Sequence, residues 1–513
     1  MELNRIDVIN PADEQIVGTI EVCERDDVER RAAQLRNAQH DWAELSTTER
    51  ARWLGLFGDW LLDNASRLGD LLIAETGKSS FDATMELPGV LDVIRYYSRN
   101  AARFLHDETR RRHSVMVATK TLSVNFRPYP LVSLLSPWNY PIYLTFGDAV
   151  PAMLAGCSVL VKPSEYAPLT VSEIVRGWRE DLRAPHVLDV ANGGPQTGQA
   201  VVDVADFVQF TGSSRTGAAV GMRATERLVP ASLELGGKDP MVVLADADLD
   251  RAVPAAVWGG LCNAGQSCAS IERVYVHADI YDQFVDRLCK EVRKVRLGAG
   301  GRGQSEVGAL ISARQRDTVE RHVANAVAAG AQAAVGGRRP TGAGFWFEPT
   351  VLTGVNHSML CMREETFGPV LPVMRVRDDD EAVALANDSA YGLSASVWSR
   401  DRGHAREVAR RLECAAVNIN DVYVNLLCVS VPQGGWGASG LGERLGGPAG
   451  IRKYCQAQSV VDSWLTARRE PQWYPASPAK LRAFITGARL LYGRRTGRFR
   501  RMKHTTNAGH ETR

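Results

Sequence analysis

The 513-residue sequence lacks the features that mark secreted, membrane-spanning or metal-clustering proteins. Its nine cysteines are scattered, odd in number and never spaced as Cys-x-x-Cys. This distribution argues against a disulfide framework or a zinc cluster and favours a reducing compartment. No basic segment followed by an apolar one opens the chain, so no signal peptide is visible. Because no apolar run reaches ~18 residues, we expect no transmembrane helix and a cytoplasmic location, with no metal centre.

A large excess of charge of one sign occurs only near the C-terminus. The chain as a whole carries a net charge of +2, whereas residues 471–510 contain nine Lys or Arg and no Asp or Glu. The rest of the chain is therefore mildly acidic. A nucleic-acid enzyme more often spreads positive charge over a working face, so no nucleic-acid partner is expected.

The chain length favours about three domains. Residues 1–109 contain a short strand-like start and then helices, one of which begins with the capping-box sequence Ser46-Thr-Thr-Glu49. The aromatic and apolar stripe over residues 53–61 indicates core packing. Alternation over residues 122–126 predicts half of a hairpin, either an oligomer contact or an ordinary surface hairpin.

Two later stretches have the pattern of α/β domains with doubly wound parallel sheets. Apolar runs separated by helical stretches predict strands at residues 131–135, 159–161, 187–190, 207–210 and 231–235. A second series begins at residue 241 and ends near residue 433, and a last strand is expected at residues 459–462. The predicted fold class is therefore α/β, with two such domains and a β-hairpin arm.

Cys268 is the strongest candidate for a catalytic residue. It follows Asn263-Ala-Gly-Gln-Ser, a small polar stretch suited to an accessible loop where a thiolate could reach a substrate. A cysteine that attacks well at neutral pH needs a lowered pKa or a neighbouring base. The alternative is a small buried hydrophobic residue.

Two polar residues stand at predicted strand ends. Glu234, in Leu233-Glu-Leu-Gly-Gly-Lys238, is either a general base or half of a structural ion pair. Asn139, in Ser136-Pro-Trp-Asn-Tyr-Pro141, is either an oxyanion donor or a turn residue. Ligands of open α/β sheets bind at the carboxyl ends of the strands, where both residues are expected.

The segment Phe210-Thr-Gly-Ser-Ser-Arg-Thr-Gly217 leads from a strand into a helix. Its glycine and the first helical N–H groups could hold a pyrophosphate. The spacing is neither a Walker loop nor a Rossmann fingerprint, so alone it is a weak signal.

Together these segments resemble the aldehyde dehydrogenase superfamily over nearly the whole chain to about residue 465. The motifs that carry the resemblance occur in the family's order and spacing, and they are S-P-W-N-Y-P, K-P-S-E, F-T-G-S, L-E-L-G-G-K, G-Q-S-C and E-E-T-F-G-P. The residues in and around these motifs are most similar to those of bacterial semialdehyde dehydrogenases and of the class 3 fatty-aldehyde type.

The resemblance implies a role for each matching residue. Cys268 would be the nucleophile, Glu234 the base for water, and Asn139 with the Cys268 backbone N–H the oxyanion hole. The resemblance also implies that NAD, with NADP as the alternative, is bound by Trp138, Lys162, Glu165, Gly212, Ser213, Glu365 and Phe367.

The implied function is oxidation of an aldehyde to an acid with NAD(P), through a thioester on Cys268. Alternatives are a CoA-acylating semialdehyde dehydrogenase, which would not need Glu234 as a base, and a catalytically silent structural member of the fold. Aromatic residues after Asn139 and on a late loop predict a pocket for uncharged aldehydes, with Tyr143, Phe146 and Tyr423 in its wall; the alternative is that they are core residues.

Two features depart from the family's usual pattern. Gln433 stands where a pocket phenylalanine is common, and Glu443-Arg444 reverses the usual Arg-Glu order. An ion pair or relay that depends on the usual order is therefore in doubt.

The predicted organisation has four parts. Residues 1–109 and 129–236 form a cofactor domain, 237–433 a catalytic domain, 110–128 and 452–466 an oligomerisation arm, and 467–513 a basic tail. We expect a homodimer or homotetramer. In the tail, an apolar stripe at helical spacing and flanking basic residues suit reversible contact with an anionic membrane. The stripe could instead pack on the enzyme itself.

Overall fold

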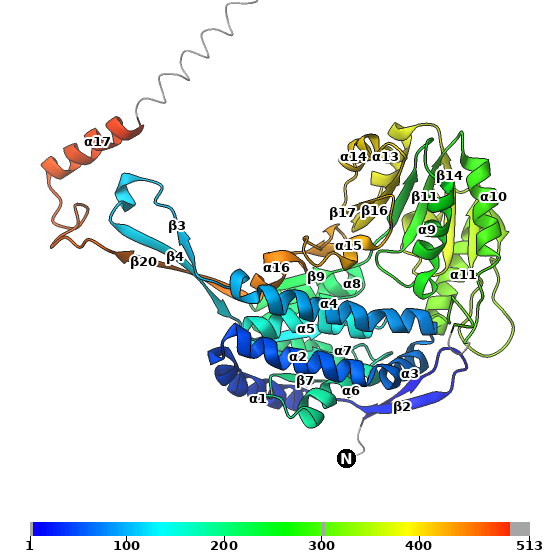
Figure 1. The fold of residues 1–513 in the computed structure, drawn as a ribbon, viewed down its shortest axis with the longest axis horizontal. Helices are drawn as coiled ribbons and strands as arrows, with labels where there is room; N and C mark the ends of the chain where they lie inside the picture. The colour runs from blue at the N-terminus through cyan, green and yellow to red at the C-terminus, as the bar shows by residue number, and fades with distance from the viewer. Residues whose placement is uncertain (1–3, 300–302, 493–513) are drawn as a thin grey trace, which may run out of the picture. The chain divides into compact units, whose positions relative to one another are not determined.

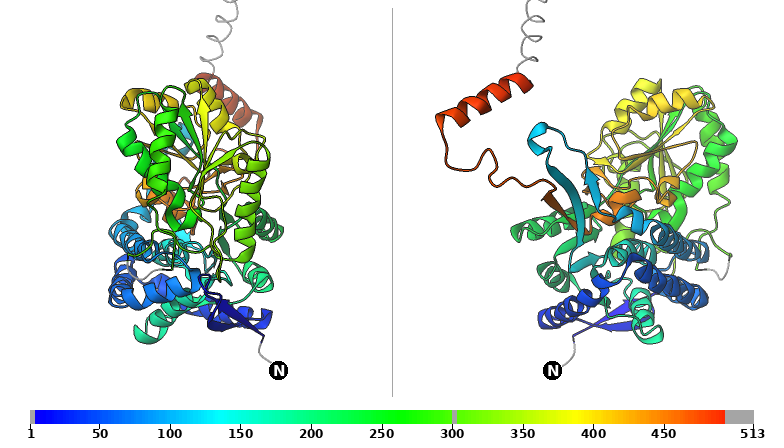
Figure 2. Two further views of the ribbon diagram at one scale, coloured as in Figure 1. Left: turned by 90° about the vertical axis from the view of Figure 1, so that its right-hand side faces the viewer. Right: turned by 60° about the vertical axis from the view of Figure 1, so that its left-hand side comes forward.

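The structure, a computed structural model, describes residues 4–299 and 303–492. The chain divides into two units. One comprises Met1–His106 and Asn125–Gln458 and is called the body here; the other comprises Asp107–Val124 and Ser459–Arg513 and is called the arm. Each unit is described by itself (Figures 1 and 2).

The first sheet of the body has six strands in the order β19-β9-β8-β5-β6-β7. The five strands other than β19 are parallel, and their order away from the centre is that of a doubly wound sheet. Every residue of β5, β6 and β8 is buried, because helices cover both faces. The strands are β5 (Leu131–Leu135), β6 (Ser158–Lys162), β7 (Leu188–Val190), β8 (Phe207–Thr211), β9 (Ala231–Glu234) and β19 (Gly440–Leu441).

The helices that follow these strands confirm the predicted alternation. They are α5 (Pro141–Ala155), α6 (Leu169–Arg176) with η2 (Gly177–Asp181), α7 (Pro195–Asp203) and α8 (Ser214–Glu226). The switch point lies between β5 and β8, which are neighbours in the sheet but lead to helices on opposite sides. A crevice is expected at the carboxyl ends of these two strands.

The second sheet of the body has seven strands in the order β12-β13-β14-β11-β10-β16-β17. All are parallel except β12, at one edge. The strands are β10 (Asp239–Val243), β11 (Ile271–His277), β12 (Gln332–Val335), β13 (Thr350–Thr353), β14 (Val370–Val376), β16 (Ser394–Trp398) and β17 (Ala416–Ile419). This series agrees with the second α/β stretch predicted from residue 241.

Helices again connect and cover these strands (Figure 1). They are α9 (Leu249–Leu261), η3 (Cys262–Gly265), α10 (Tyr281–Val292), α11 (Ala313–Ala328), α12 (Leu360–Arg363), α13 (Asp379–Asn387), α14 (Arg402–Ala409) and α15 (Val424–Leu427). Helix α16 (Gly447–Arg452) packs instead on α4 and α5. Two short strands, β15 (Tyr391–Gly392) and β18 (Trp436–Gly437), pair with each other.

The N-terminal part of the body begins with an antiparallel hairpin, β1 (Arg5–Ile9) and β2 (Ile16–Glu21). Four helices follow: α1 (Arg25–Glu44), α2 (Thr47–Asp63), α3 (Ala65–Thr76) and α4 (Ser80–Phe104). The predicted capping box is present at the start of α2, where the Ser46 backbone N–H donates to Glu49 at 2.7 Å. Leu54, Phe57 and Leu61 are fully buried, which confirms the stripe as core.

The arm contains the predicted hairpin. Strands β3 (Glu108–Arg110) and β4 (Lys120–Pro128) are antiparallel, with η1 (Val115–Val117) between them, and β20 (Cys455–Ser463) adds a third strand beside β4. The last described element is helix α17 (Pro478–Tyr492), in which no residue is buried. Within residues 4–299 and 303–492, no helix has the length and apolar content needed to cross a bilayer.

Candidate active site

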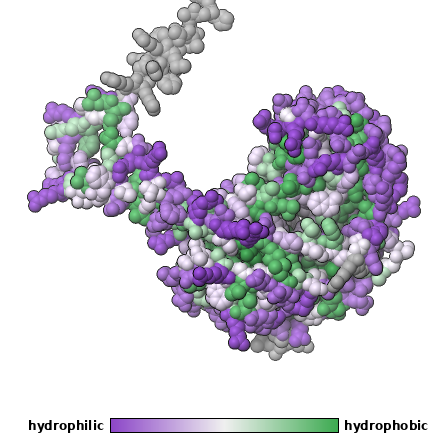
Figure 3. All heavy atoms as spheres, in the orientation of Figure 1, coloured by the Kyte–Doolittle hydropathy of each residue, from purple (hydrophilic) through white to green (hydrophobic). Residues whose placement is uncertain are grey.

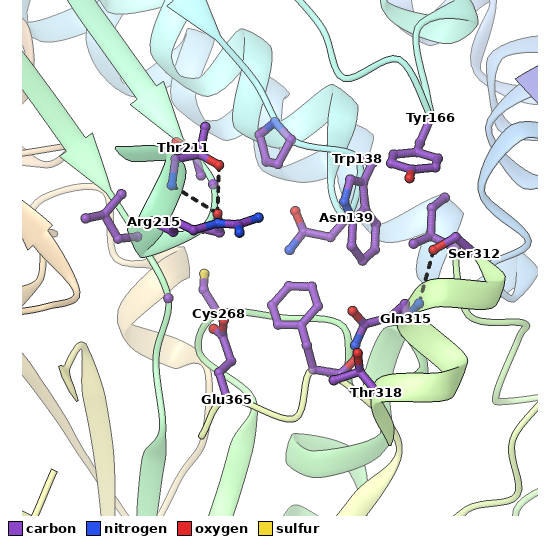
Figure 4. Close-up of a pocket in the computed structure, with 18 of the residues that line it drawn as sticks. Trp138, Asn139, Tyr166, Thr211, Arg215, Cys268, Ser312, Gln315, Thr318 and Glu365 are labelled. Carbon is purple, nitrogen blue, oxygen red and sulfur yellow. Dashed lines mark hydrogen bonds between the residues drawn. The ribbon is translucent and has the colours of Figure 1, made fainter. Parts of the chain in front are cut away.

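Seven of the ten proposed catalytic and cofactor residues line one cleft of the body (Figure 4), whereas Glu234, Lys162 and Glu165 are not part of its lining. The turn after β5 contributes Trp138 and Asn139. The turn after β8 contributes Gly212 and Ser213, as the switch point predicts. Segments connected to the second sheet supply the opposite side, with Cys268, Glu365 and Phe367. Residues more than 200 positions apart in the sequence are thus brought to one cleft.

Cys268 is held by an unusual backbone turn. Asn263, Ala264 and Gly265 all have positive φ, and a side chain at Gly265 would meet the carbonyl of Gly368 at 2.0 Å. Backbone strain of this kind persists only where the surroundings fix it. Gly237, from the L-E-L-G-G-K motif, is needed for close approach, because a Cβ there would lie 2.1 Å from the Cys268 carbonyl oxygen. The motifs around Glu234 and Cys268 therefore pack directly on each other.

Asn139 is positioned by several buried contacts. Its side-chain amide donates to the Gln266 carbonyl at 3.1 Å, which leaves a second amide N–H on the same nitrogen. In Figure 4 this nitrogen lies on the side of the amide that faces Cys268. The Asn139 carbonyl accepts from Lys78 Nζ at 2.8 Å and from Asn263 Nδ2 at 2.9 Å. This arrangement suits an oxyanion donor beside the thiol.

Glu234 is the last residue of β9 and is buried. Its Oε2 has no hydrogen-bond partner among the described residues. Burial raises the pKa of its carboxyl to about 7, and the charge of Arg444 acts in the opposite direction and lowers this pKa. A buried carboxylate with a pKa near neutrality is suited to act as a general base.

The Cys268 thiol is itself strongly perturbed. Burial first, and then the charge of Glu234, raise its pKa well above the ordinary value, while Arg444 lowers it. Burial and the charge of Glu234 therefore favour the thiol over the thiolate. Attack on a carbonyl carbon requires removal of its proton, which a neighbouring base can accomplish.

One wall of the cleft suits a dinucleotide phosphate. Ser213 caps α8 by accepting from the Thr216 N–H at 3.3 Å, so the N-terminus of this helix opens on the cleft. Helix N-termini favour anions. Gly212 admits close approach, because a Cβ there would lie 2.6 Å from the Phe210 ring. Lys162 and Glu165 form an ion pair of 3.2 Å at the end of β6, next to Tyr166 of the cleft wall.

The opposite wall is built by the E-E-T-F-G-P motif. Glu365 accepts from the Gly237 N–H at 2.8 Å, and burial, followed by the charge of Glu272, raises its pKa to about 8. The Phe367 ring meets the Trp138 ring edge to face at 5.5 Å. Glu272 accepts from the Thr366 and Phe367 N–H groups and pairs with Lys238. The donors and glycines of both walls therefore fit a nicotinamide dinucleotide.

A second cavity reaches Cys268 from another direction and has mostly apolar and aromatic walls. Tyr143 and Tyr423 line it, as the sequence predicts. Phe146 does not line it, and that prediction was wrong. Its ring is fully buried against Phe57, at 5.6 Å between centroids, because it lies on the side of α5 that packs on α2. Other wall residues are Met85, Leu144, Trp258, Leu426 and Leu427.

The sequence reasoning missed several residues that shape the site. Arg444 lines the apolar cavity and donates to Asp148 at 3.3 Å. The Gln433 amide donates to the carbonyls of Asn425 and Leu426 at 3.1 Å, and these hydrogen bonds hold the segment that places Leu426 in the cavity wall. Glu86 accepts from the Ile142 and Tyr143 N–H groups and so caps α5. Gln433 and Arg444 had a signal in the sequence, because both depart from the family's usual pattern, whereas Glu86 had none.

Comparisons with known proteins agree with this geometry. The model of the aldehyde dehydrogenase family matches residues 1–460. A Mycobacterium ulcerans protein named as a succinate-semialdehyde dehydrogenase using NADP+ is 39% identical over 448 residues, 86% of each chain. A 4,4'-diapolycopene aldehyde oxidase from a Methylomonas species is 38% identical over 494 residues, 96% of this chain and 92% of its own. A solved Mycobacterium tuberculosis aldehyde dehydrogenase complexed with NAD+ has a TM-score of 0.85 and 33% identity, covering 90% of this chain and 96% of its own.

The chain therefore belongs to the aldehyde dehydrogenase family. It is an NAD(P)-dependent oxidoreductase that acts on an aldehyde, and the α/β fold predicted from the sequence is confirmed.

Proposed function

We propose that this enzyme oxidises an uncharged aldehyde to the carboxylic acid through a covalent thioester on Cys268, which water then hydrolyses. The observation that carries the proposal is the convergence of a half-buried thiol, a buried carboxylate and an amide donor, from Cys268, Glu234 and Asn139. A CoA-acylating enzyme or a catalytically silent protein would have no use for a carboxyl group with a pKa of about 7 beside the thiol.

In the first step Cys268 Sγ attacks the carbonyl carbon after its proton has passed to Glu234. The negative charge that develops on the carbonyl oxygen is stabilised by the Asn139 amide and by the Cys268 backbone N–H. The nicotinamide of the bound cofactor supplies the hydride acceptor. Between the two steps Glu234 releases the proton that it took from Cys268 to solvent. In the second step the ionised Glu234 takes a proton from water, the resulting hydroxide attacks the thioester, and the C–S bond breaks to release the acid while the proton returns to the Cys268 sulfur.

The cofactor is NAD in preference to NADP in this proposal. Glu165 can accept hydrogen bonds from a ribose 2′-OH, whereas a 2′-phosphate would meet its negative charge. Lys162, at 3.2 Å from Glu165, limits the discrimination because it partly offsets that charge.

The substrate preference rests on the second cavity. Its wall is mostly aromatic and aliphatic, and its charged members are Asp82, Glu86 and Arg444. Glu86 is paired with Lys78 and Arg444 with Asp148, and Asp82 accepts from the Ser79 hydroxyl at 2.7 Å. We therefore favour hexanal-like or benzaldehyde-like substrates over dicarboxylic semialdehydes.

Purified enzyme tests the proposal directly through NADH formation with a panel of aldehydes. Hexanal and benzaldehyde should exceed succinic semialdehyde in kcat/KM, and Cys268→Ser should be inactive with all of them. Oxidation that depends on added CoA, or no turnover with any aldehyde, would refute the proposed reaction.

We further propose that the enzyme is a homodimer or homotetramer whose subunits meet through the arm. The three-stranded sheet β20-β4-β3 is small, and every residue of β20 except Cys455 and Ser463 is exposed. An isolated sheet of this size gains stability when a partner covers it. Analytical ultracentrifugation of the full chain measures the assembly, and a monomer at micromolar concentration would contradict it.

The tail supports a proposal of reversible binding to an anionic membrane surface. Helix α17 exposes Leu481, Phe484 and Ile485, with Lys480 and Arg482 beside them. In Figure 3 the helix carries both apolar and hydrophilic surface. Six further Lys or Arg follow between residues 494 and 503, outside the described residues. Each basic residue near anionic lipid contributes ~1 kcal/mol.

Co-sedimentation with phosphatidylglycerol vesicles tests this binding. Full-length protein should sediment at low salt and be released at high salt, and a chain ending at Pro478 should stay in solution. Equal sedimentation of both chains, or none at low salt, would exclude the proposal.

A further inference from the structure

Arg444 and Glu234 present two buried groups of opposite charge in the same part of the body. Arg444 Nη2 and Glu234 Oε2 are each inaccessible to solvent, and neither has a hydrogen-bond partner among the described residues. Buried charged groups are rarely left unpartnered, since each lost hydrogen bond costs on the order of 1–3 kcal/mol. Arg444 Nη2 therefore lacks a hydrogen-bond acceptor and Glu234 Oε2 lacks a donor, and each group could provide the partner that the other lacks.

The chain segment that carries Arg444 is fixed beside the strand that carries Glu234. Gly440 pairs with Glu234 in antiparallel register, and the Leu235 N–H donates to the Ser439 carbonyl at 2.9 Å. Ser232 donates to the Glu443 carbonyl at 2.9 Å. Arg444 also lines the apolar cavity together with Cys268. Its guanidinium is thus held close to both reacting groups.

The remaining charged and titratable groups around Arg444 come from α5 and from the end of the body. Asp148 accepts from Arg444 Nε at 3.3 Å and lies 3.6 Å from Lys453 Nζ. The Tyr143 ring lies 5.9 Å from the guanidinium, and Tyr454 donates to Asp148 at 3.5 Å. With Glu234 ionised, the cations Arg444 and Lys453 are balanced by the anions Asp148 and Glu234. With Glu234 protonated, the buried cluster carries one uncompensated positive charge.

We propose that Arg444 is a positioning residue that forms an ion pair with ionised Glu234 and thereby keeps the general base charged for thioester hydrolysis. This inference rests on the proposed function. When the thioester is hydrolysed, Glu234 accepts one proton from water, the resulting hydroxide adds to the acyl carbon, and the C–S bond breaks. The proton then returns from Glu234 to the Cys268 sulfur, so the step consumes only water.

The test compares the pH dependence of kcat in the parent enzyme with that in Arg444→Gln and Arg444→Lys. Removal of the cation should move the acidic limb upward by about one pH unit or more, so that Arg444→Gln loses about tenfold in kcat at pH 6.5 but little at pH 9. Arg444→Lys should restore most of the parent profile. Intact-protein mass spectrometry should show acyl-enzyme accumulating in Arg444→Gln at pH 6.5.

Arg50→Gln is a matched control, since Arg50 is a buried arginine of the same sheet domain that donates only to backbone carbonyls. It should leave the acidic limb in place. An unchanged limb in a folded, active Arg444→Gln would overturn the inference. So would a selective rise in KM for succinic semialdehyde with an unchanged limb, which would make Arg444 a substrate contact. Parent-level turnover in Glu234→Gln would instead refute the proposed function.

Discussion

Replacing Glu234 by Gln separates the two halves of the proposed reaction. The amide has nearly the shape of the buried carboxyl but cannot take a proton from water. Acylation of Cys268 should still occur when external base or water accepts the thiol proton at high pH. Hydrolysis of the thioester should become rate-limiting, because general base catalysis contributes about 10²–10⁴-fold.

Rapid mixing at pH 8.5 with saturating NAD and hexanal measures both halves. The Glu234→Gln variant should release about one NADH per active site in a burst and then turn over about 10²–10⁴-fold more slowly than the parent. The parent should show an acidic limb of kcat near pH 7, the pKa to which burial raises Glu234, because only the ionised form acts as a base. The variant should lack this limb.

Two results would refute the reasoning. Steady turnover at the parent rate in Glu234→Gln would show that another group activates water. A burst in Cys268→Ser, with Asn139 and the cofactor site intact, would show that the thiol is not the nucleophile.

Three further predictions follow from the same geometry. Glu165→Ala should narrow the ratio of kcat/KM for NAD to that for NADP, and a parent enzyme that prefers NADP would contradict the assigned role of Glu165. Lys78→Met removes a donor to the Asn139 carbonyl, so kcat with hexanal should fall by about tenfold or more while the Kd for NAD, measured by fluorescence quenching, stays the same. The stability of Glu234→Gln should exceed that of the parent by up to about 3 kcal/mol above pH 7, and by nothing below pH 4.5, in urea unfolding. The sign follows because a carboxyl whose folded pKa is raised from 4.5 to about 7 loses stability as pH rises through that interval, whereas an amide does not titrate.

The sheets could be predicted from the sequence because their signal is local. Buried parallel strands are short apolar runs bounded by glycine or polar turns, and each predicted run of the first sheet lies within one or two residues of a strand. The turns after β5 and β8 were predictable as ligand sites because ligands of open α/β sheets bind at the carboxyl ends of the strands. The strand order makes these two turns neighbours.

Side-chain direction was less predictable. Tyr143 and Phe146 are three residues apart on α5, and the sequence assigns both to the cavity. In the structure Tyr143 faces the cavity, whereas Phe146 packs on Phe57 of α2. The helix is buried on nearly all sides, so apolar residues occupy every face and periodicity cannot mark the one that borders the cavity.

The paired charges were not predictable because their partners are far apart in the sequence. Asp148 and Arg444 are 296 residues apart, and neither belongs to a motif that indicates pairing. Lys238 and Glu272 form another buried pair, which fixes the loop that carries Phe367. Long-range ion pairs of this kind become visible only when the topology is known.

The reversed Glu443-Arg444 order has a consequence for how the two steps of the reaction are coupled. The buried cluster of Asp148, Arg444 and Lys453 carries one excess positive charge, so it can stabilise one further anion beside it. Glu234 and Cys268 compete for that role, since the charge of Glu234 raises the pKa of the Cys268 thiol, and Arg444 lowers the pKa of both groups. In the proposed reaction the negative charge moves to sulfur when Glu234 takes the thiol proton. When the sulfur becomes acylated its charge is lost, and Glu234 can release the proton and ionise again. A single excess positive charge thus suits a reaction in which the nucleophile and the base are needed in turn and never both as anions.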